Sequence, residues 1–334
     1  MDRKDPQTLA ELGEFGLIGR IRCLFPAPEG VRGIGDDCAI LPQQDGLDTL
    51  VSTDMLVEGT HFLRDGIPPY HLGWKSAAVN LSDIAAMGGK PVGTFLSLAL
   101  PASLEQAWIE EFLRGYGDLS ARFGASLLGG DTTASPDRIC INVAVLGQCP
   151  AGTARRRDDA RPGDLVCVTG TLGDSAAGLK AILDGVERDA DVLSLIDRHC
   201  LPLPRVEEGM KLAAVEGMHA MMDISDGIGS DLGHILEASG AGAEIDLASL
   251  PLSPALQRVC ARLGWDPQEL AVSGGEDYEL LFTCTAEAER HLGLPHTVIG
   301  RITPPSSAGR GGASPVSWLG SDRPFGGFDH FRKG

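Results

Sequence analysis

Gly33-Ile-Gly-Asp-Asp-Cys-Ala-Ile-Leu41 and Val51-Ser-Thr-Asp-Met-Leu-Val-Glu-Gly-Thr-His-Phe62 are two neighbouring runs that organise the chain. Each joins an apolar segment typical of a β-strand, residues 38–41 and 49–52, to acidic residues. Strands bounded by glycines and carboxylates place those carboxylates at strand ends, where a hard cation can collect oxygen ligands. The two runs therefore predict the beginning of a site for Mg²⁺ and phosphate.

The aspartates of these runs are Asp36, Asp37 and Asp54. Ser52 and Thr53 stand beside Asp54 and would add hydroxyl or carbonyl oxygens. His61 follows Asp54 by seven residues, which is close enough to face the same cleft.

Composition limits the class of protein. The 334 residues suffice for two domains with buried cores, and 43% hydrophobic with 22% charged residues indicates a globular chain. The net charge of −18 argues against nucleic acid or an anionic membrane as a partner.

Cysteine usage and the N-terminal residues indicate a cytoplasmic location. The eight cysteines are scattered without a C-x-x-C pair, which predicts reduced thiols and neither a zinc nor a redox motif. The N-terminus has no apolar signal segment, and no run approaches the ~20 apolar residues of a membrane helix. We therefore expect no membrane partner.

Periodicity predicts a mixed α/β first half. A helix over residues 12–25 precedes the two strands, and later helices are expected over residues 73–89 and from Ser103, where Ser103-Leu-Glu-Gln106 resembles a capping box. Strands follow each of these helices, so the order is strand, strand, helix, strand, helix, strand, strand. Residues 148–162 are rich in Pro, Gly, Arg and Asp, so we place a boundary between domains 1–150 and 151–334.

Further aspartates occur in separate Gly- or Ser-containing motifs. Asp83 follows Ser76 and Asn80 at helical spacing, forming a narrow polar stripe. A solvated stripe is the alternative, but small neighbours and the lack of Lys and Glu in the stripe predict that Asp83 faces the interior. Asp131 follows a Gly pair, which lets backbone approach a ligand closely. Asp223 and Asp226 flank Ser225 between a predicted strand and helix, where helix capping is the alternative for one of them.

The motifs together supply many oxygen ligands and few His or Cys, which favours Mg²⁺ with a polyphosphate over zinc or iron. The aspartates concerned are Asp37, Asp54, Asp83, Asp131, Asp223 and Asp226. One arginine of Arg155, Arg156 and Arg157 is a candidate phosphate ligand, and the other two fit a solvated linker. The chain has no G-x-x-x-x-G-K-[ST] motif, so a P-loop nucleotide fold is excluded.

Taken together, the motifs resemble the thiamine-monophosphate kinase family of the aminoimidazole-ribotide-synthetase-like superfamily. Besides the two opening runs, the matching motifs are Val79-Asn-Leu-Ser-Asp-Ile-Ala-Ala-Met-Gly88, Gly129-Gly-Asp-Thr-Thr133, Thr169-Gly-Thr-Leu-Gly-Asp-Ser-Ala-Ala-Gly178, Asp223-Ile-Ser-Asp-Gly227 and Ser273-Gly-Gly-Glu-Asp-Tyr-Glu279. They span nearly the whole chain in the family's order. The resemblance implies a two-domain α/β (α+β) fold whose N-terminal mixed sheet joins a second copy in a dimer barrel, with a C-terminal α/β domain that completes the site.

The resemblance also implies ATP-dependent phosphorylation of thiamine monophosphate to thiamine diphosphate, with several Mg²⁺ ions, as the last step of thiamine diphosphate biosynthesis. It assigns Asp37, Asp54, Asp83, Asp131 and Asp223 as catalytic. The implied roles of the matching positions are Mg²⁺ ligation by Asp37, Ser52, Thr53, Asp54, Asp83, Asp131, Asp223 and Asp226, ATP binding by Gly130, Asp131, Arg157 and Ser225, and substrate binding by His61, Glu276 and Phe328.

Two alternatives stay open from the sequence. One is another ATP-using enzyme of the same superfamily. A selenophosphate synthetase would want a reactive cysteine near the start, where only Cys23 stands, and the hydrogenase-maturation relative ends in cysteine, unlike Gly334. The other is a non-catalytic acidic metal-binding module.

Overall fold

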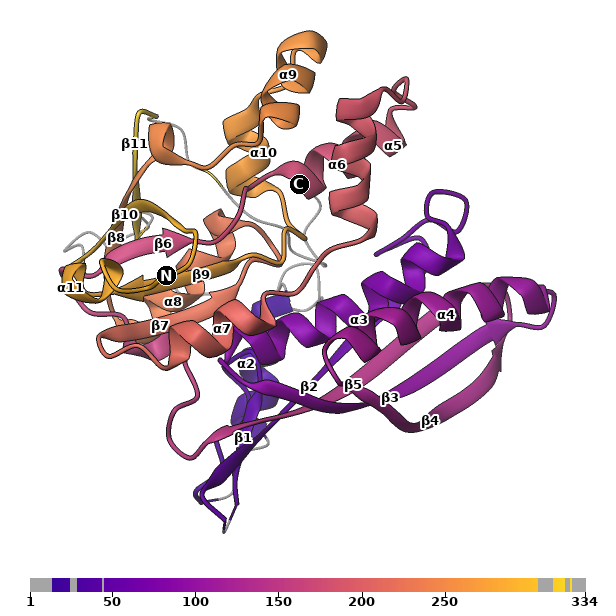
Figure 1. Ribbon diagram of the computed structural model, residues 1–334, viewed down its shortest axis with the longest axis horizontal. Coiled ribbons are helices and arrows are strands. Elements are labelled where there is room, and N and C mark those ends of the chain that lie inside the picture. The colour runs from indigo at the N-terminus through magenta and orange to yellow at the C-terminus, as the bar shows by residue number, and fades with distance from the viewer. Residues whose placement is uncertain (1–13, 25–28, 44, 306–314, 322–324, 326–334) are drawn as a thin grey trace, which may run out of the picture.

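The computed structural model describes residues 14–24, 29–43, 45–305, 315–321 and 325. A short helix, α2 (Glu14–Leu24), lies within the helix expected over residues 12–25. Figure 1 shows two sheets that meet along the helix α3 (Pro69–Ala86).

The first sheet has five strands in the order β1-β2-β5-β3-β4, with only the β3–β4 pair parallel. Helices α3 and α4 (Gln106–Arg122) cover one face of this sheet, and among the described residues no helix covers the other face (Figure 1). The predicted order of strands and helices is confirmed. The bounds are β1 Ala39–Pro42, β2 Leu47–Val57, β3 Lys90–Pro101, β4 Ser126–Ser135 and β5 Cys140–Pro150.

The predicted start of α4 is wrong. The helix begins at Gln106 after Glu105, and no side chain caps its N-terminus. The chain first makes a turn after β3, in which the Leu104 N–H donates to the Pro101 carbonyl. This turn uses the residues that the capping-box interpretation had placed in the first helical turn.

The second sheet has six strands in the order β11-β8-β10-β6-β9-β7. It is mixed, with β11 parallel to β8 and the other assigned pairs antiparallel. The strands are β6 Leu165–Val168, β7 Met218–Asp223, β8 Gly242–Asp246, β9 Leu280–Cys284, β10 Thr297–Thr303 and β11 Val316–Leu319. The helices are α5 Asp174–Leu183, α6 Ala190–Cys200, α7 Val206–Ala213, α8 Ile228–Ser239, α9 Pro254–Leu263, α10 Pro267–Ser273 and α11 Ala286–Glu289, with short 3₁₀ turns η1 Arg157–Asp159 and η2 Leu247–Ser249.

Helix α3 joins the two halves. Its residues Leu81 and Ile84 pack into the core of the first half, while Ala85 and Ala86 pack with Met218 and Phe282 of the second half. A helix of small residues permits this close contact on both sides. The polar stripe of α3 is thereby held where the two halves meet.

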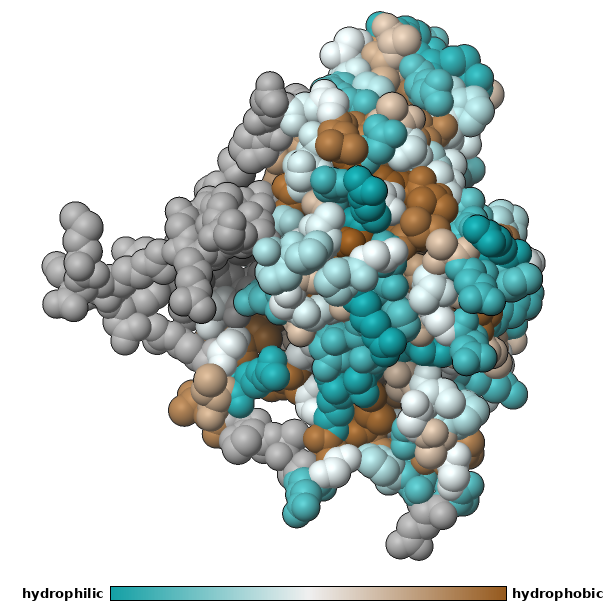
Figure 2. All heavy atoms as spheres, turned by 90° about the vertical axis from the view of Figure 1, so that its left-hand side faces the viewer, coloured by the Kyte–Doolittle hydropathy of each residue, from teal (hydrophilic) through white to brown (hydrophobic). Residues whose placement is uncertain are grey.

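No helix among the described residues is long and apolar enough to cross a membrane. On the face in Figure 2, hydrophobic residues form small groups among hydrophilic ones. All eight cysteines are free thiols.

Candidate active site

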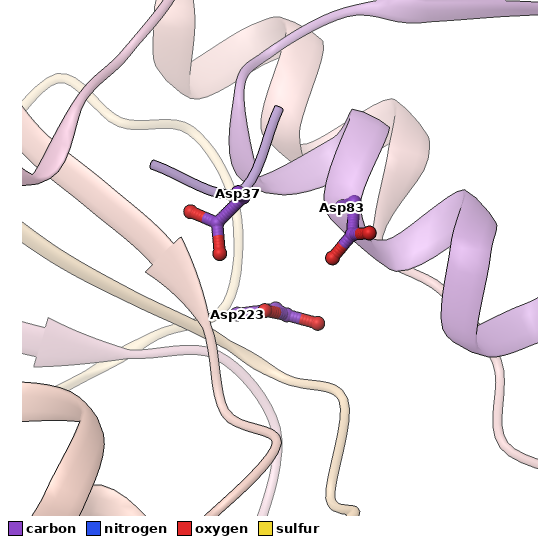
Figure 3. A group of neighbouring side chains, drawn as sticks. All are labelled: Asp37, Asp83 and Asp223. Atoms are coloured by element: carbon purple, nitrogen blue, oxygen red, sulfur yellow. The ribbon is translucent and has the colours of Figure 1, made fainter. Parts of the chain in front are cut away.

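Three carboxylates from distant parts of the sequence converge at the junction of the two halves. Asp37 precedes β1, Asp83 lies on α3 and Asp223 ends β7, and Figure 3 shows them facing one another. One oxygen from each lies within 4.8 Å of the others, which is a spacing that a single metal ion can bridge. We call these three residues the aspartate cluster.

The polar stripe of α3 faces the interior, so the solvated alternative is wrong. Ser76 and Asn80 are fully buried, and Asn80 Oδ1 accepts the backbone N–H of Asp54 at 3.2 Å. Ser52 donates its hydroxyl to Asp83 Oδ2 at 2.5 Å. The stripe therefore fixes β2 against α3 and holds Asp54 beside Asp83.

Another residue of α3, Ser82, orients Asp223, the third residue of the aspartate cluster. Ser82 is buried and donates its hydroxyl to Asp223 Oδ2 at 2.5 Å. A hydrogen bond to a carboxylate is stronger than one between neutral groups, and it favours the ionised form.

Arg157 is the arginine of the 155–157 run that reaches the aspartate cluster. Its Nη2 donates to Asp37 Oδ1 at 2.5 Å, and its backbone N–H donates to Asp36 Oδ1 at 3.1 Å. Arg155 instead donates to the carbonyls of Met218 and Ala213 near the end of α7. Arg156 pairs with the acidic residues that follow it, Asp158 and Asp159.

The acidic residues around the cluster are too many for the cations that the chain provides there. Burial, then repulsion from Asp37, raises the pKa of Asp54 to about 6 and the pKa of Asp223 to about 7. Burial, then repulsion from Asp54 and Asp223, raises the pKa of Asp83 well above its usual range. The Asp37 Oδ2 atom is buried and has no hydrogen-bond partner among the described residues. These features fit an exogenous cation.

The loop after β7 is organised by a residue that the sequence motifs did not single out. Asp231 is buried on α8, and its Oδ2 accepts the N–H groups of Ser225 (3.1 Å) and Asp226 (3.2 Å). Helix α8 has Gly227 as its N-cap, with no side-chain hydrogen bond, so the capping alternative for Ser225 or Asp226 is wrong. Asp226 does not belong to the aspartate cluster, although it and Asp223 both act on the carboxyl group of Asp231.

Two expected ligands lie on the uncovered face of the first sheet, opposite to Asp54. The Thr53 hydroxyl donates to the Val143 carbonyl of β5 and accepts from the Asn142 side chain, so the Thr53 backbone carbonyl is the group that stays a candidate ligand. Asp131 is exposed on β4, the edge strand, and its carboxylate accepts the N–H of Thr132. The structure does not bring Asp131 to the aspartate cluster within one chain.

Gly130 has a packing reason to be glycine. Its φ is +156°, and a Cβ there would lie 1.8 Å from the Leu96 carbonyl oxygen of β3. Close approach of β3 therefore suffices to require glycine at this position of β4, whatever ligand it meets.

The expected substrate residues His61 and Glu276 lie near each other. His61 Nδ1 accepts the N–H of Val57 at 3.0 Å, which places the proton of a neutral ring on Nε2. Glu276 has a left-handed backbone, with φ +64°, and His61 is close enough to contribute to the lowering of its pKa. Phe328 lies outside the described residues.

Glu276 is held by a lysine that sequence reasoning missed. Lys75, on α3, is fully buried, and its Nζ lies 2.9 Å from Glu276 Oε1. His199 of α6 lies 3.3 Å from Glu276 Oε2. Although burial acts to raise it, the Lys75 ammonium and His199 hold the pKa of Glu276 below its usual range.

The same loop is anchored at its far end by Glu279, which is also buried. Its carboxylate accepts from Arg205 at 2.5 Å and 2.6 Å, from Arg198 at 2.7 Å and from the Thr169 hydroxyl at 2.7 Å. The loop 276–279 is thus held at one end by the contacts of Glu276 with Lys75 and His199 and at the other by the ion pairs of Glu279.

Comparisons with known proteins agree with this architecture. Residues 35–149 match the model of the AIR synthase related protein, N-terminal domain, and residues 161–309 match that of the C-terminal domain. The two matched domains and the site between them define an AIR synthase related protein.

The relatives narrow the class further. The thiamine-monophosphate kinase of Escherichia coli (strain K12) is 44% identical over 308 residues, covering 87% of this chain and 90% of the relative. That of Aquifex aeolicus is 40% identical over 295 residues, covering 88% and 92%. The chain belongs to the thiamine-monophosphate kinase family.

Solved structures support the same placement. The structure described as "AaThiL complexed with AMPPCP and TMP" has a TM-score of 0.88 at 37% identity and covers 97% of this chain and 99% of its own. The kinase from Stenotrophomonas maltophilia has a TM-score of 0.74 at 38% identity, with 93% and 98% covered. Hydrogenase maturation protein HypE in complex with ATP, at 22% identity and a TM-score of 0.68, shares the fold.

Proposed function

We propose that this chain catalyses the Mg²⁺-dependent transfer of the γ-phosphoryl group of ATP to thiamine monophosphate, forming thiamine diphosphate by direct in-line attack. The observation that carries the proposal is the aspartate cluster, whose carboxylate charge exceeds the charge of Arg157. The relatives' shared name and the ATP analogue with TMP in a similar structure support the substrates.

The residues present fit Mg²⁺. Asp37, Asp83 and Asp223 would hold it, with Asp54 and the Ser52 hydroxyl beside them. When bound, Mg²⁺ neutralises phosphate charge and orients the phosphoryl groups for displacement. The wider ligand set, with the Thr53 carbonyl, Asp226 and Asp131, and the presence of several ions belong to the same proposal.

The chain's own residues supply binding and orientation. Arg157 offers a guanidinium that matches phosphate geometry, and Ser225 stands on a loop that Asp231 holds in place. Gly130 and Asp131 are the other proposed nucleotide contacts. The acceptor is a phosphate monoester that is largely dianionic at neutral pH, since its second pKa is about 6, so no general base is required.

His61, Glu276 and Phe328 are the proposed contacts with thiamine monophosphate. Because His61 Nδ1 already accepts a backbone N–H, its Nε2–H acts as a hydrogen-bond donor toward the substrate phosphate rather than as a base.

We further propose a homodimer that joins the first sheets of two copies in a barrel. The face without helices exposes Met55 and Phe95, and the edge strand β4 exposes Leu127 and Leu128. An exposed apolar edge strand has unpaired backbone N–H and C=O groups that can pair with a strand of another chain. The proposed division into domains 1–150 and 151–334, and a cytoplasmic location, complete this picture.

A coupled assay of ATP consumption tests the function. We expect ATP turnover that requires both thiamine monophosphate and Mg²⁺, stops with EDTA, and yields thiamine diphosphate by chromatography. ATP turnover that is independent of thiamine monophosphate would favour another enzyme of the superfamily. No turnover, with Mg²⁺ still bound, would favour a metal-binding module.

A further inference from the structure

Lys75 is an unusual residue to find inside a protein. It lies in the middle of α3, and its side chain is 1% exposed. Burying an ammonium group is unfavourable unless a counter-charge and hydrogen bonds accompany it. The counter-charge here is Glu276, whose side chain keeps 28% exposure and therefore still reaches the surface of the site.

The contacts of Lys75 define the protonation of His199. The Lys75 ammonium has only donors, and it lies 3.4 Å from His199 Nε2, so that nitrogen must be the acceptor. The ring proton is then on Nδ1, which lies 3.1 Å from the Ser175 hydroxyl oxygen and 3.3 Å from Glu276 Oε2. His199 is therefore neutral and directs an N–H toward Glu276 and Ser175.

This arrangement holds both carboxylate oxygens of Glu276. Lys75 lies against Oε1 and His199 against Oε2, while the backbone N–H of Glu276 donates to the Ser225 carbonyl at 2.8 Å. The left-handed backbone of Glu276 is costly for a residue with a side chain, and such strain is kept where the surroundings enforce it. The contacts explain how the strained loop is kept in one conformation.

We propose that Lys75 is a positioning residue for substrate binding: with neutral His199, it clamps the Glu276 carboxylate so that its remaining lone pairs face the positively charged ring of thiamine monophosphate. This inference rests on the proposed function and deepens it. Lys75 itself does not touch the substrate in this account. It acts through Glu276, which remains an anion and remains oriented because the buried ammonium is fixed on α3.

The first test is a split in kinetic constants. Lys75→Met keeps the length of the side chain and removes the charge, and we expect KM for thiamine monophosphate to rise about 10- to 100-fold, because small misplacements of a binding group have effects of this size. KM for ATP should change less than about 2-fold, as judged against the ordinary scatter of distant substitutions. Lys180→Met is the matched control, because it removes a lysine that pairs on the surface with Asp184. A KM for thiamine monophosphate that stays at the wild-type value in Lys75→Met would overturn the proposal.

The second test is a double-mutant cycle with Glu276→Gln. If Lys75 acts only through Glu276, the double variant has the same KM for thiamine monophosphate as Glu276→Gln alone. Multiplied losses would contradict the proposal. The double variant leaves no unpaired buried charge, so it also serves where Lys75→Met alone does not fold.

A structural readout is independent of activity. Nitrogen-15 NMR of the wild-type protein, assigned with His199→Gln, should give His199 as the Nδ1–H tautomer, and Lys75→Met should change that signal. An Nε2–H tautomer in the wild-type protein would refute the clamp. If the wild-type protein consumes no ATP with thiamine monophosphate, the proposed function fails together with the substrate role of Lys75. Turnover with an unchanged KM in Lys75→Met overturns the role of Lys75 alone.

Discussion

The aspartate cluster and Glu276 both lie at the junction of the molecule, and their negative charges are balanced differently. The aspartate cluster has Arg157 as its direct partner, and burial with mutual repulsion raises the pKa values of Asp83 and Asp223. Although partial burial acts to raise the pKa of Glu276, the Lys75 ammonium and His199 hold it below its usual range. The aspartate cluster therefore has more carboxylates than neighbouring cations, whereas Glu276 is balanced by the Lys75 ammonium.

The difference separates two tasks. A carboxylate set that lacks internal cations gains stability when a cation arrives from solution, so it suits a site that collects Mg²⁺ and phosphates. A carboxylate that already has an internal counter-charge gains no stability from an added ion, and its fixed geometry suits recognition of a substrate.

The largest effect is expected from Asp83→Asn. An amide cannot replace a charged ligand, so we expect kcat at saturating Mg²⁺ to fall roughly 100- to 1,000-fold, corresponding to about 3–4 kcal/mol of lost transition-state stabilisation. The melting temperature without Mg²⁺ should stay within about 2 °C of the wild-type value, because ionisation of Asp83 is unfavourable in the fold. Steady-state kinetics and calorimetry measure both quantities.

Asp184→Asn is the control for that variant, since Asp184 is an exposed carboxylate paired with Lys180. It should match the wild-type kcat. An Asp83→Asn enzyme with wild-type kcat would mean that the cluster is not the metal site.

A smaller effect is expected from Arg157→Gln. The loss of a charge-assisted contact of about 2 kcal/mol should raise KM for ATP roughly 30-fold. Arg156→Gln removes the neighbouring arginine, which pairs with Asp158 and Asp159, and should leave KM for ATP unchanged. Equal effects of the two variants would show that the phosphate contact is not specific to Arg157.

The smallest effect is expected from Ser82→Ala. The variant removes one hydrogen bond to Asp223, so kcat should fall roughly 5-fold, for about 1 kcal/mol. Higher Mg²⁺ should recover part of this loss, because Asp223 itself remains. A loss as large as that of Asp83→Asn would argue that Ser82 has a role beyond orienting Asp223.

The sequence contained local signals for the aspartate cluster but none for Lys75 and His199, which hold Glu276. Asp37, Asp83 and Asp223 each sit in a short motif at an element boundary or on a polar stripe, so their types and surroundings suggested one site. Lys75 lies inside α3 and His199 in the last turn of α6, each without a motif, and only the packing of these helices brings them to Glu276. Such pairings depend on tertiary contacts that no local pattern encodes.

Strand periodicity likewise predicted the strands better than the direction of individual side chains. The succession of strands and helices along the first half followed from the sequence. The face on which Asp131 and the Thr53 hydroxyl lie depends instead on the pairing of β2, β5, β3 and β4. The start of α4 was missed because a turn after β3 took the capping residues.

The central claim is that the aspartate cluster binds a cation. Thermal unfolding with and without Mg²⁺ at two pH values tests this claim most directly. The raised pKa values mean that the folded state binds more protons than the unfolded state between about pH 4 and pH 7, so without metal the free energy of unfolding falls as pH rises through that window. Mg²⁺ replaces those protons, so saturating Mg²⁺ should raise the melting temperature by about 2–6 °C at about pH 8 and by under about 1 °C at about pH 5. Asp83→Asn should lose this increment, while Asp184→Asn should keep it. A wild-type melting temperature at about pH 8 that does not respond to Mg²⁺ would contradict the account.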